Sequence, residues 1–278
     1  MTVRAAIKSA TRSLSASIAR TKIGEALLEQ VVDAAMTRTK TISHRDVELS
    51  FSVPNRLSHF RVATFSTKEP ETLEWIDAIS QGSVLWDIGA NVGLYSCYAA
   101  KARNCRVFAF EPSVFNLELL ARNICLNGLS GQVTIVPLPL CERVTDSTLN
   151  MTTTQWGGAL SSFGVEHGFD GRAMDKAFEF RTIGLSGDDC IANLAVPYPE
   201  YIKMDVDGIE HLILRGAAQV LKHVRSVQIE INDEFATQAE ESRLLLEASG
   251  LRFVSKAHSD IIEDSSTFGR TFNQYWAR

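Results

Sequence analysis

The stretch Val84-Leu85-Trp86-Asp87-Ile88-Gly89-Ala90-Asn91-Val92-Gly93-Leu94-Tyr95 decides the fold. An apolar strand ends in a carboxylate, and a turn with Gly89 and Gly93 opens a helix. Glycines permit a sharp turn and let backbone N–H groups approach a ligand closely. A dinucleotide-binding turn would read G-x-G-x-x-G, but Asn91 and Leu94 replace its second and third glycines. The stretch therefore predicts a strand-to-helix turn of an α/β sheet and argues against a bound pyrophosphate.

A second strand ends in a carboxylate at Phe108-Ala109-Phe110-Glu111-Pro112, 24 residues after Asp87. Adjacent parallel strands end side by side, so Glu111 can accept both hydroxyls of a ribose bound above the glycine turn. Pro112 ends the strand. An exposed glutamate at a strand end is the alternative, but the upstream turn favours ribose binding.

A third acidic segment is Ile202-Lys203-Met204-Asp205-Val206-Asp207-Gly208-Ile209-Glu210. The strand delivers Asp205 to the same sheet edge, and Glu210 lies in the first turn of the next helix, where acids also complement the helix dipole. The spacing resembles a calcium loop, but Ile209 stands where an oxygen ligand is expected. We expect no metal site. Mg²⁺, which needs few protein ligands, remains an alternative that no motif supports.

Strands and helices alternate from Ser83 onward, which indicates a parallel sheet with helices on both faces. The predicted strands are 83–87, 105–110, 133–137, 200–205 and 225–231, and the clearest helix is 209–221. Upstream, we expect a helix over 4–36, two strands within 47–66 around a turn at Pro54-Asn55, and a helix over 70–79. The glycine-rich stretch 151–187 is expected to form a flexible cover with one or two short strands.

Composition narrows the class of protein. The 278 residues carry 28 Lys and Arg against 33 Asp and Glu, for a net charge of −5, which disfavours nonspecific nucleic-acid binding. No run of about 18 apolar residues predicts a membrane span. Five cysteines without a C-x-x-C pair, and a beginning unlike a signal peptide, suggest reduced thiols and a cytoplasmic protein.

The first 22 residues contain five basic side chains and no acid, namely Arg4, Lys8, Arg12, Arg20 and Lys22. Peripheral membrane contact through residues 4–22 is one interpretation. However, no aromatic anchor is present, so a packing helix or a homo-oligomer contact is favoured. We divide the chain into an N-terminal helical segment, 1–46, and a larger domain, 47–278.

Taken together and in this order, the motifs resemble those of the FkbM-type family of class I S-adenosylmethionine-dependent methyltransferases. Lys68–Ile76 and Leu214-Arg215-Gly216-Ala217 add to the resemblance, which covers roughly residues 48 to 232. It implies a Rossmann-like sheet of seven mostly parallel strands with an antiparallel last pair. It also implies S-adenosylmethionine as cofactor and a hydroxyl of a sugar, glycan or polyketide as acceptor. Asp207 departs from the family pattern, in which a Glu is more usual.

The resemblance assigns roles to residues near the cofactor. Asp87 would face the methionyl ammonium group, Gly89, Ala90 and Gly93 would form a backbone cradle, and Glu111 would bind the ribose. The remaining cofactor candidates are Glu69, Thr72, Asn91, Pro112, Asn116 and Asn127. Glu69 and Thr72 could instead begin a helix, and both Asn116 and Asn127 could cap a helix or fill a turn.

An alcohol acceptor has a high pKa, so its proton needs a base. Asp205 is the first candidate because it ends a strand beside the cofactor cleft, followed by Asp207 and Glu210. His167, in the cover, could also reach an acceptor. Lys203 is expected to point away from this face.

Two other functions compete with O-methyl transfer. A nucleotide- or nicotinamide-dependent oxidoreductase would use a similar sheet, but the missing glycines argue against it. A catalytically inactive cofactor-binding or assembly protein would be the other; Asp87, Glu111 and Asp205 argue against a loss of cofactor binding.

Overall fold

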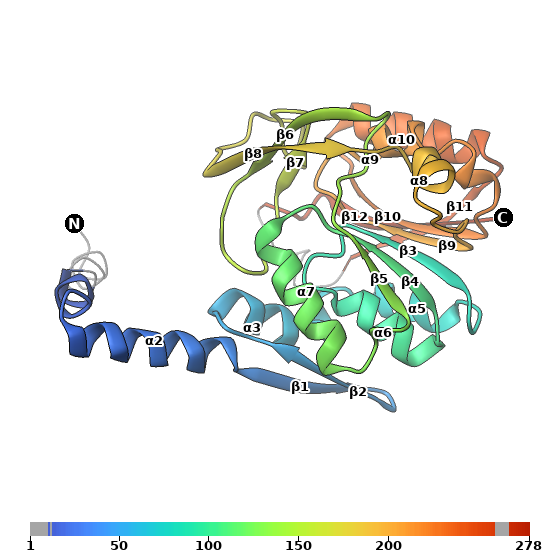
Figure 1. The fold of residues 1–278 in the computed structure, drawn as a ribbon. Coiled ribbons are helices and arrows are strands. Elements are labelled where there is room, and N and C mark those ends of the chain that lie inside the picture. Colours follow the sequence, from blue (N-terminus) through green and yellow to red (C-terminus); the bar gives the residue numbers. More distant parts are fainter. Residues whose placement is uncertain (1–10, 12, 259–266) are drawn as a thin grey trace.

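A seven-stranded sheet forms the centre of the molecule (Figure 1), in a computed structural model that describes residues 11, 13–258 and 267–278. Its strand order is β11-β12-β10-β9-β3-β4-β5. The strands are β3 (Val84–Ile88), β4 (Arg106–Phe110), β5 (Val133–Val136), β9 (Tyr201–Met204), β10 (Ser226–Asn232), β11 (Arg252–Ala257) and β12 (Thr271–Ala277). Only β12 runs antiparallel to its neighbours. The predicted fold class is confirmed, and the five strands predicted from Ser83 onward each lie within one residue of their predicted bounds.

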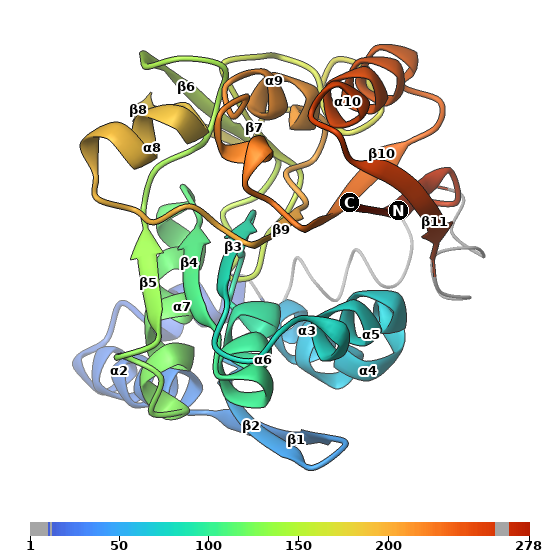
Figure 2. The ribbon, with the colours of Figure 1, turned by 90° about the vertical axis from the view of Figure 1, so that its right-hand side faces the viewer.

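Helices cover both faces of this sheet (Figure 2). One face carries α5 (Pro70–Ala78), α6 (Leu94–Arg103) and α7 (Val114–Leu126), and the other carries α8 (Gly187–Asn193), α9 (Glu210–Arg215) and α10 (Ala236–Ala248). Side chains alternate along a strand, so Leu85 packs with Tyr98 of α6 in one core and Trp86 packs with Ile213 of α9 in the other. The apolar run in β3 therefore reflects burial on both faces.

The helix expected over 209–221 is shorter than its apolar pattern suggested. It ends at Arg215, and a 3₁₀ turn follows at Val220–Lys222. At the break, a Cβ on Gly216 would lie 2.4 Å from the backbone oxygen of Cys141. Val220 and Leu221 are nevertheless buried. The apolar pattern therefore predicted the burial of these residues correctly, but it predicted too long a helix.

The N-terminal hairpin lies upstream of its predicted position. Its strands are β1 (Thr39–His44) and β2 (Val47–Ser52). The predicted turn at Pro54-Asn55 is wrong, because Asn55 and Ser58 form a capping box that begins α3 (Arg56–Ala63). A short helix α4 (Phe65–Lys68) follows. The expected boundary between residues 46 and 47 falls inside the hairpin.

Two asparagines of the α7 region attach this hairpin to the body. Asn123 Oδ1 accepts the Ser52 N–H at 2.7 Å, and Asn127 bonds both the N–H and the carbonyl of Ser50, at 2.9 and 2.8 Å. Asn127 was a cofactor candidate. Its side chain instead satisfies the backbone of a sheet edge, so the structure places it outside the site.

The helix α2 (Lys22–Met36) projects away from the body (Figure 1). Residues 13–18 are also helical, but the chain turns at 19–21, so one continuous helix over 4–36 is not formed. Residues 4–10 and 12 of that expectation lie outside the described residues. Throughout the described ranges, no helix has both the length and the apolar character that crossing a bilayer requires.

A second, three-stranded antiparallel sheet lies beside the large one (Figure 1). It contains β6 (Thr145–Met151), β7 (Ser161–Phe163) and β8 (Phe178–Gly184), in the order β7-β6-β8. The stretch 151–187, expected to be a cover, thus contains the two short strands β7 and β8. We call residues 157–160, which lead into β7, the cover segment.

We expect Gly89→Ala to destabilise the fold strongly. Gly89 has φ +84°, and a Cβ there would lie 1.8 Å from the backbone oxygen of Asp205. Overpacking against backbone and a left-handed φ together should lower the free energy of unfolding by about 3 kcal/mol or more. Urea denaturation measures this.

The matched control is Gly82→Ala. Gly82 also has a positive φ, +71°, but no atom lies within 4 Å of the place that a Cβ would take. Its cost should be the backbone strain alone, about 1–2 kcal/mol. Equal losses in the two variants would contradict the packing argument.

Candidate active site

Three hollows meet at Gly89, Asn91 and Asp205, at the carboxyl ends of β3, β4 and β9. This edge is where ligands bind in open α/β sheets. We name each hollow after one residue that lines it: the Glu111 pocket, the Lys203 pocket and the Glu230 pocket. All three residues line each pocket, so the pockets adjoin one another.

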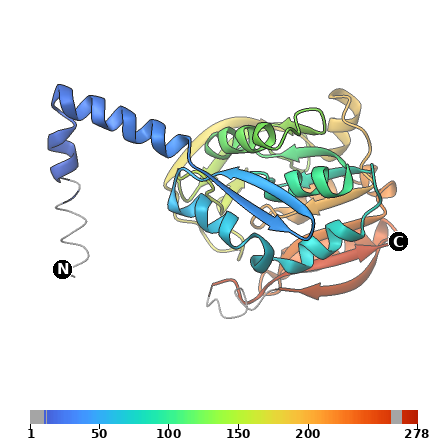
Figure 3. The same ribbon diagram turned by 90° about the horizontal axis from the view of Figure 1, so that it is seen from below.

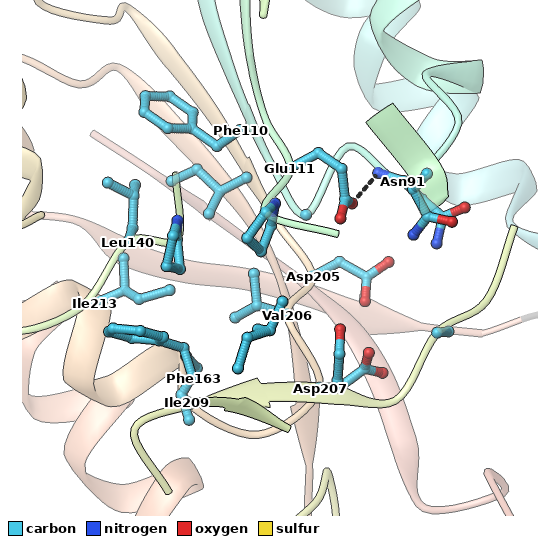
Figure 4. A pocket seen from close by; sticks show the side chains of 18 of the residues that line it. Asn91, Phe110, Glu111, Leu140, Phe163, Asp205, Val206, Asp207, Ile209 and Ile213 are labelled. Carbon is cyan, nitrogen blue, oxygen red and sulfur yellow. Dashed lines mark hydrogen bonds between the residues drawn. The ribbon is translucent and has the colours of Figure 1, made fainter. Parts of the chain in front are cut away.

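The Glu111 pocket is apolar on one side and acidic on the other (Figure 4). Its carboxylate accepts the N–H groups of Asn91 and Ser113, at 2.8 and 2.7 Å. Burial raises the pKa of Glu111 to about 7, although these two hydrogen bonds oppose the rise. The apolar wall includes Phe110, Pro112, Leu138, Leu140, Phe163 and Ile213. This combination suits a flat aromatic base beside a ribose.

The Lys203 pocket holds a buried cation that sequence reasoning placed elsewhere. Lys203 Nζ lies 3.3 Å from Asp205 Oδ2 and 5.2 Å from the Tyr95 ring centroid. The expectation that Lys203 points away is wrong. Residues two apart on a strand share a face, so the spacing of Lys203 and Asp205 already contained this information.

Glu69 supplies a buried anion in the same pocket. It pairs with Lys68 at 2.5 Å and accepts the Thr72 hydroxyl at 3.3 Å. Burial alone would raise the pKa of Glu69, but the charges of Lys68 and Lys203 outweigh it and lower the pKa to about 2. Thr72 does not line the pocket; it supports Glu69. Anion and cation together suit the zwitterionic end of an amino acid.

Asp87 lies just behind these groups, directly opposite Lys203 in the parallel register of β3 and β9. Ser96 donates to its Oδ2 at 2.5 Å, while Oδ1 is buried without a hydrogen-bond partner. Burial raises the pKa of Asp87, and the charge of Lys203 opposes the rise. Asp87 lines none of the three pockets, so the predicted contact with a ligand's ammonium group is not formed by the lining, and Asp87 lies behind Lys203 instead.

The backbone cradle has two parts with different tasks. Ala90 lines the Lys203 pocket. Gly93 has φ +80° and begins α6, and a Cβ on it would lie 2.4 Å from Leu120 Cδ1. Gly93 therefore serves helix packing, whereas Gly89 and Asn91 border the hollows.

The Glu230 pocket is the largest of the three, about 330 Å³. Leu57, Phe60, Leu160 and Phe268 contribute apolar surface, and Asp205, Asp207 and Glu230 contribute carboxylates. One oxygen from each acid lies within 4.8 Å of the others. Such oxygens could accept hydroxyl groups or ligate Mg²⁺.

Mutual repulsion changes the acidity of this cluster. Burial, reinforced by the charge of Asp205, raises the pKa of Asp207 to about 6. Burial and the charges of Asp205 and Glu69 raise the pKa of Glu230 well above its ordinary value. Sequence reasoning did not select Glu230 as a site residue, although it lies near the end of a predicted strand.

The cover segment is hydrogen-bonded to candidate site residues. The Gly158 carbonyl accepts from Asn91 Nδ2 and Asn116 Nδ2, at 2.7 and 3.0 Å. The Leu160 N–H donates to Asp207 Oδ2 at 2.7 Å. Arg61, which sequence reasoning missed, donates from Nε to the Gly157 carbonyl at 2.6 Å. Asn116 thus lines the Glu111 pocket and also holds the cover.

Two predicted bases lie outside the three pockets. Glu210 is fully buried and accepts the N–H groups of Val206 and Gly208, both at 3.1 Å, so it organises the loop after β9. His167 packs edge-to-face on Phe235, with ring centroids 5.2 Å apart. The structure therefore does not bring either side chain to a pocket that could hold a ligand at this edge.

Comparisons with known proteins agree with this arrangement. The model of the methyltransferase FkbM domain matches residues 87–253, more than half of the chain. A hexuronic acid methyltransferase, AglP of Haloferax volcanii, is 25% identical over 169 residues, which are 56% of this chain and 59% of that protein. The crystal structure of methyltransferase FkbM from Methylobacillus flagellatus superposes with a TM-score of 0.50 and 16% identity, over 80% of this chain and 52% of that one. The chain therefore spans less than two thirds of either relative.

We expect the protein to lose stability as the pH rises from about 5.5 to 8. Burial raises the pKa values of Glu111 and Glu210 from 4.5 to about 7. It raises the pKa of Asp207 from 3.8 to about 6. The folded state therefore binds these protons more tightly. The stabilisation of the folded state that comes from these protons is fully present below about pH 4, and it is lost as the pH rises through 6 to 7. Glu69, with its lowered pKa, has the opposite sign, but its change is complete by about pH 5. Burial also lowers the pKa of His211 below 6.5, so this one group opposes the decline up to about pH 6.5, and the three acids outnumber it.

Urea unfolding across this pH range measures the effect. Glu210→Gln removes one titrating group and should flatten the decline by up to about 1.4 kcal/mol per pH unit. Glu240→Gln, at an exposed position of α10, should leave the slope unchanged. A stability that rises over this pH range, or an unaltered slope in Glu210→Gln, would show that these buried acids do not have raised pKa values.

Proposed function

The chain belongs to the FkbM methyltransferase family, and we propose that it transfers the methyl group of S-adenosylmethionine to a hydroxyl of a sugar or glycan. The observation that carries this proposal is the meeting of three pockets at Gly89, Asn91 and Asp205. Two pockets have the chemistry of the two ends of the cofactor, and the third has room for an acceptor. Membership of this family leaves no support for a nicotinamide-dependent oxidoreductase.

The cofactor residues follow from the lining of two pockets. Glu111 would accept the ribose hydroxyls, with the base against the apolar wall of the Glu111 pocket. Lys203 would face the amino-acid carboxylate, and Glu69 its ammonium group. When bound, S-adenosylmethionine supplies an electrophilic methyl group on a sulfonium. The protein's part is alignment, which can supply about 7–11 kcal/mol of barrier reduction.

The acceptor would occupy the Glu230 pocket. Its carboxylates can accept hydrogen bonds from several hydroxyls, and Phe60 and Phe268 offer the apolar surface on which a sugar ring packs. The relative named a hexuronic acid methyltransferase supports a sugar. A polyketide-type hydroxyl is the alternative acceptor.

We assign the proton-accepting role to Glu230 in place of Asp205. Lys203 Nζ pairs with Asp205 Oδ2 at 3.3 Å, so that carboxylate already has a cationic partner. One oxygen of Asp207 is occupied by the Leu160 N–H. Glu230 has a raised pKa and lies in the same cluster, and a base is most effective when its pKa is near the working pH. Asp205 and Asp207 would orient the acceptor.

A methyl-transfer screen with mass detection tests the proposed activity. The panel contains uronic acids, neutral hexoses, their glycosides and simple alcohols, each with S-adenosylmethionine. Mild base separates the products, because it cleaves a methyl ester formed on a uronic carboxylate but not a methyl ether formed on a hydroxyl. Ether products on saccharides support the proposal. Ester products would show that the acceptor group is a carboxylate and not a hydroxyl. Cofactor binding without transfer to any saccharide would favour a catalytically inactive binding protein.

We expect Glu111→Ala to weaken S-adenosylmethionine binding. Losing charge-assisted bonds to the ribose should cost about 1.5–3 kcal/mol, roughly 10- to 150-fold in Kd. Calorimetric titration measures this, with circular dichroism to check the fold. Glu240→Ala, an exposed glutamate, is the control. A wild-type Kd in a folded Glu111→Ala protein would disprove ribose binding by this residue.

We expect Glu230→Gln to lower turnover by roughly 10²–10⁴ while the Kd for S-adenosylmethionine stays within a few fold, because only proton transfer is removed. The measurement uses a saccharide identified in the screen. A metal role for Asp205, Asp207 and Glu230 predicts a different result: a chelator abolishes activity and Mg²⁺ restores it. Chelator-resistant, wild-type turnover in Glu230→Gln would remove this residue from the reaction.

A further inference from the structure

The proposed reaction gives no role to Arg61, a cation that lines the Glu230 pocket. Arg61 lies in the last turn of α3 and lines the Lys203 pocket as well. Leu57 and Phe60 of the same helix also line the Glu230 pocket. Residues three or four apart lie on the same face of a helix, so one face of α3 forms a wall of this pocket, with a guanidinium group in its last turn.

The acids of the Glu230 pocket come from other elements. Asp205 and Asp207 follow β9 and Glu230 lies in β10, whereas α3 lies beside the hairpin, at the side of the body from which α2 projects (Figure 3). Two of these acids repel an anion less than their formal charge suggests. Asp205 is paired with Lys203, and burial with the neighbouring charges raises the pKa of Glu230 well above its ordinary value.

Most of the hydrogen-bonding capacity of Arg61 is unused. A guanidinium carries five N–H bonds, one on Nε and four on the two Nη atoms. Nε donates to the Gly157 carbonyl at 2.6 Å, whereas the Nη atoms form no hydrogen bond or ion pair with the residues that the structure describes. The side chain is half-buried. The bond to Gly157 therefore holds a cation in the pocket wall and leaves its two outermost groups available to a ligand.

An oxyanion is the ligand group that this arrangement suits best. The planar fork of an arginine binds carboxylate and phosphate oxygens in pairs, and these charge-assisted bonds are stronger than bonds to neutral hydroxyls. The carboxylate of S-adenosylmethionine is one such group. However, it already has a cation in Lys203, which is buried and lines only the Lys203 pocket among the three. The acceptor is the other ligand within reach of Arg61.

We propose that the acceptor is an anionic saccharide whose carboxylate or phosphate group is bound by Arg61. This inference rests on the proposed function, and it names the charge that the acceptor carries and the residue that selects it. The saccharide would lie across the Glu230 pocket, with its oxyanion at α3 and its reacting hydroxyl among the carboxylates that follow β9 and lie in β10. Arg61 would then determine acceptor specificity in addition to holding the cover segment.

Pairs of acceptors that differ in charge test the proposal. For each hexose of the methyl-transfer screen, the uronic acid is compared with its primary amide, and a sugar phosphate with the unphosphorylated sugar. The measurement is kcat/KM for methyl ether formation at saturating S-adenosylmethionine. We expect the wild-type protein to prefer the anion in at least one kind of pair by about 10- to 150-fold, mainly through KM. The kind of pair that shows the preference distinguishes a carboxylate from a phosphate.

Arg61→Met removes the charge and the fork but keeps a long, unbranched side chain. It should raise KM for the anionic member about 10- to 150-fold and bring the preference close to one. Loss of the bond to Gly157 also loosens the cover segment, but this affects both members of a pair alike, so the ratio isolates the charge. The control is Arg56→Met, at an exposed position of the same helix, which should leave the preference unchanged.

The outcomes separate this inference from the proposed function. Ether products formed with equal kcat/KM on both members of every pair would overturn the inference and leave the proposed function standing. A wild-type preference in Arg61→Met would do the same. A much larger Kd of Arg61→Met for S-adenosylmethionine, measured by calorimetry, would assign Arg61 to the cofactor and also overturn the inference. Failure to methylate any saccharide, charged or neutral, would overturn both.

Discussion

The close approach of the ends of β3 and β9 is the constraint on which the site depends. The Asp205 N–H donates to the Ile88 carbonyl at 3.0 Å, and the Gly89 Cα lies so near the Asp205 carbonyl that a side chain has no room. This contact is what allows three separate pockets to share Gly89, Asn91 and Asp205. Any residue other than glycine would push the two strand ends apart, and the pockets with them.

Around that junction, the protein buries charges of both signs at short range. Lys203 is compensated by Asp205, and Glu69 by Lys68, so the two most deeply buried ions of the Lys203 pocket each have a partner of opposite charge. Unpaired buried charges would be far too costly. Acids that look alike in sequence therefore differ in the structure. Asp205 and Glu69 each pair with a lysine, and the pKa of Glu69 is lowered, whereas burial raises the pKa values of Glu230 and Asp207.

Local sequence patterns were sufficient where one physical effect dominated. The strands could be located because burial on both faces produces a continuous apolar run in the sequence. The site carboxylates could be located because they directly follow such runs. Errors arose where a residue type suits more than one role, or where tertiary contacts decided. Pro54-Asn55 is a pair of residues typical of turns, but Asn55 caps a helix. Glu210 resembles a site acid, but it accepts hydrogen bonds from three donors, two in its own loop and one in α10. The pairing of Lys203 with Asp205 was readable from strand periodicity, whereas the binding of the cover by Arg61 depends on residues 96 positions apart.

The way in which the cover segment is held has a consequence for which residues around the Glu230 pocket can be replaced. Asn91, Asn116, Asp207 and Arg61 all bond to main-chain atoms of residues 157–160. Main-chain atoms are the same for every residue type apart from proline. The side chains of Ala159 and Leu160 line the Glu230 pocket and take no part in these bonds, although the φ of +60° at Leu160 disfavours β-branched replacements there. On the proposed function, in which the Glu230 pocket holds the acceptor, side chains that contact the acceptor can change while the main-chain bonds that hold the cover segment are preserved.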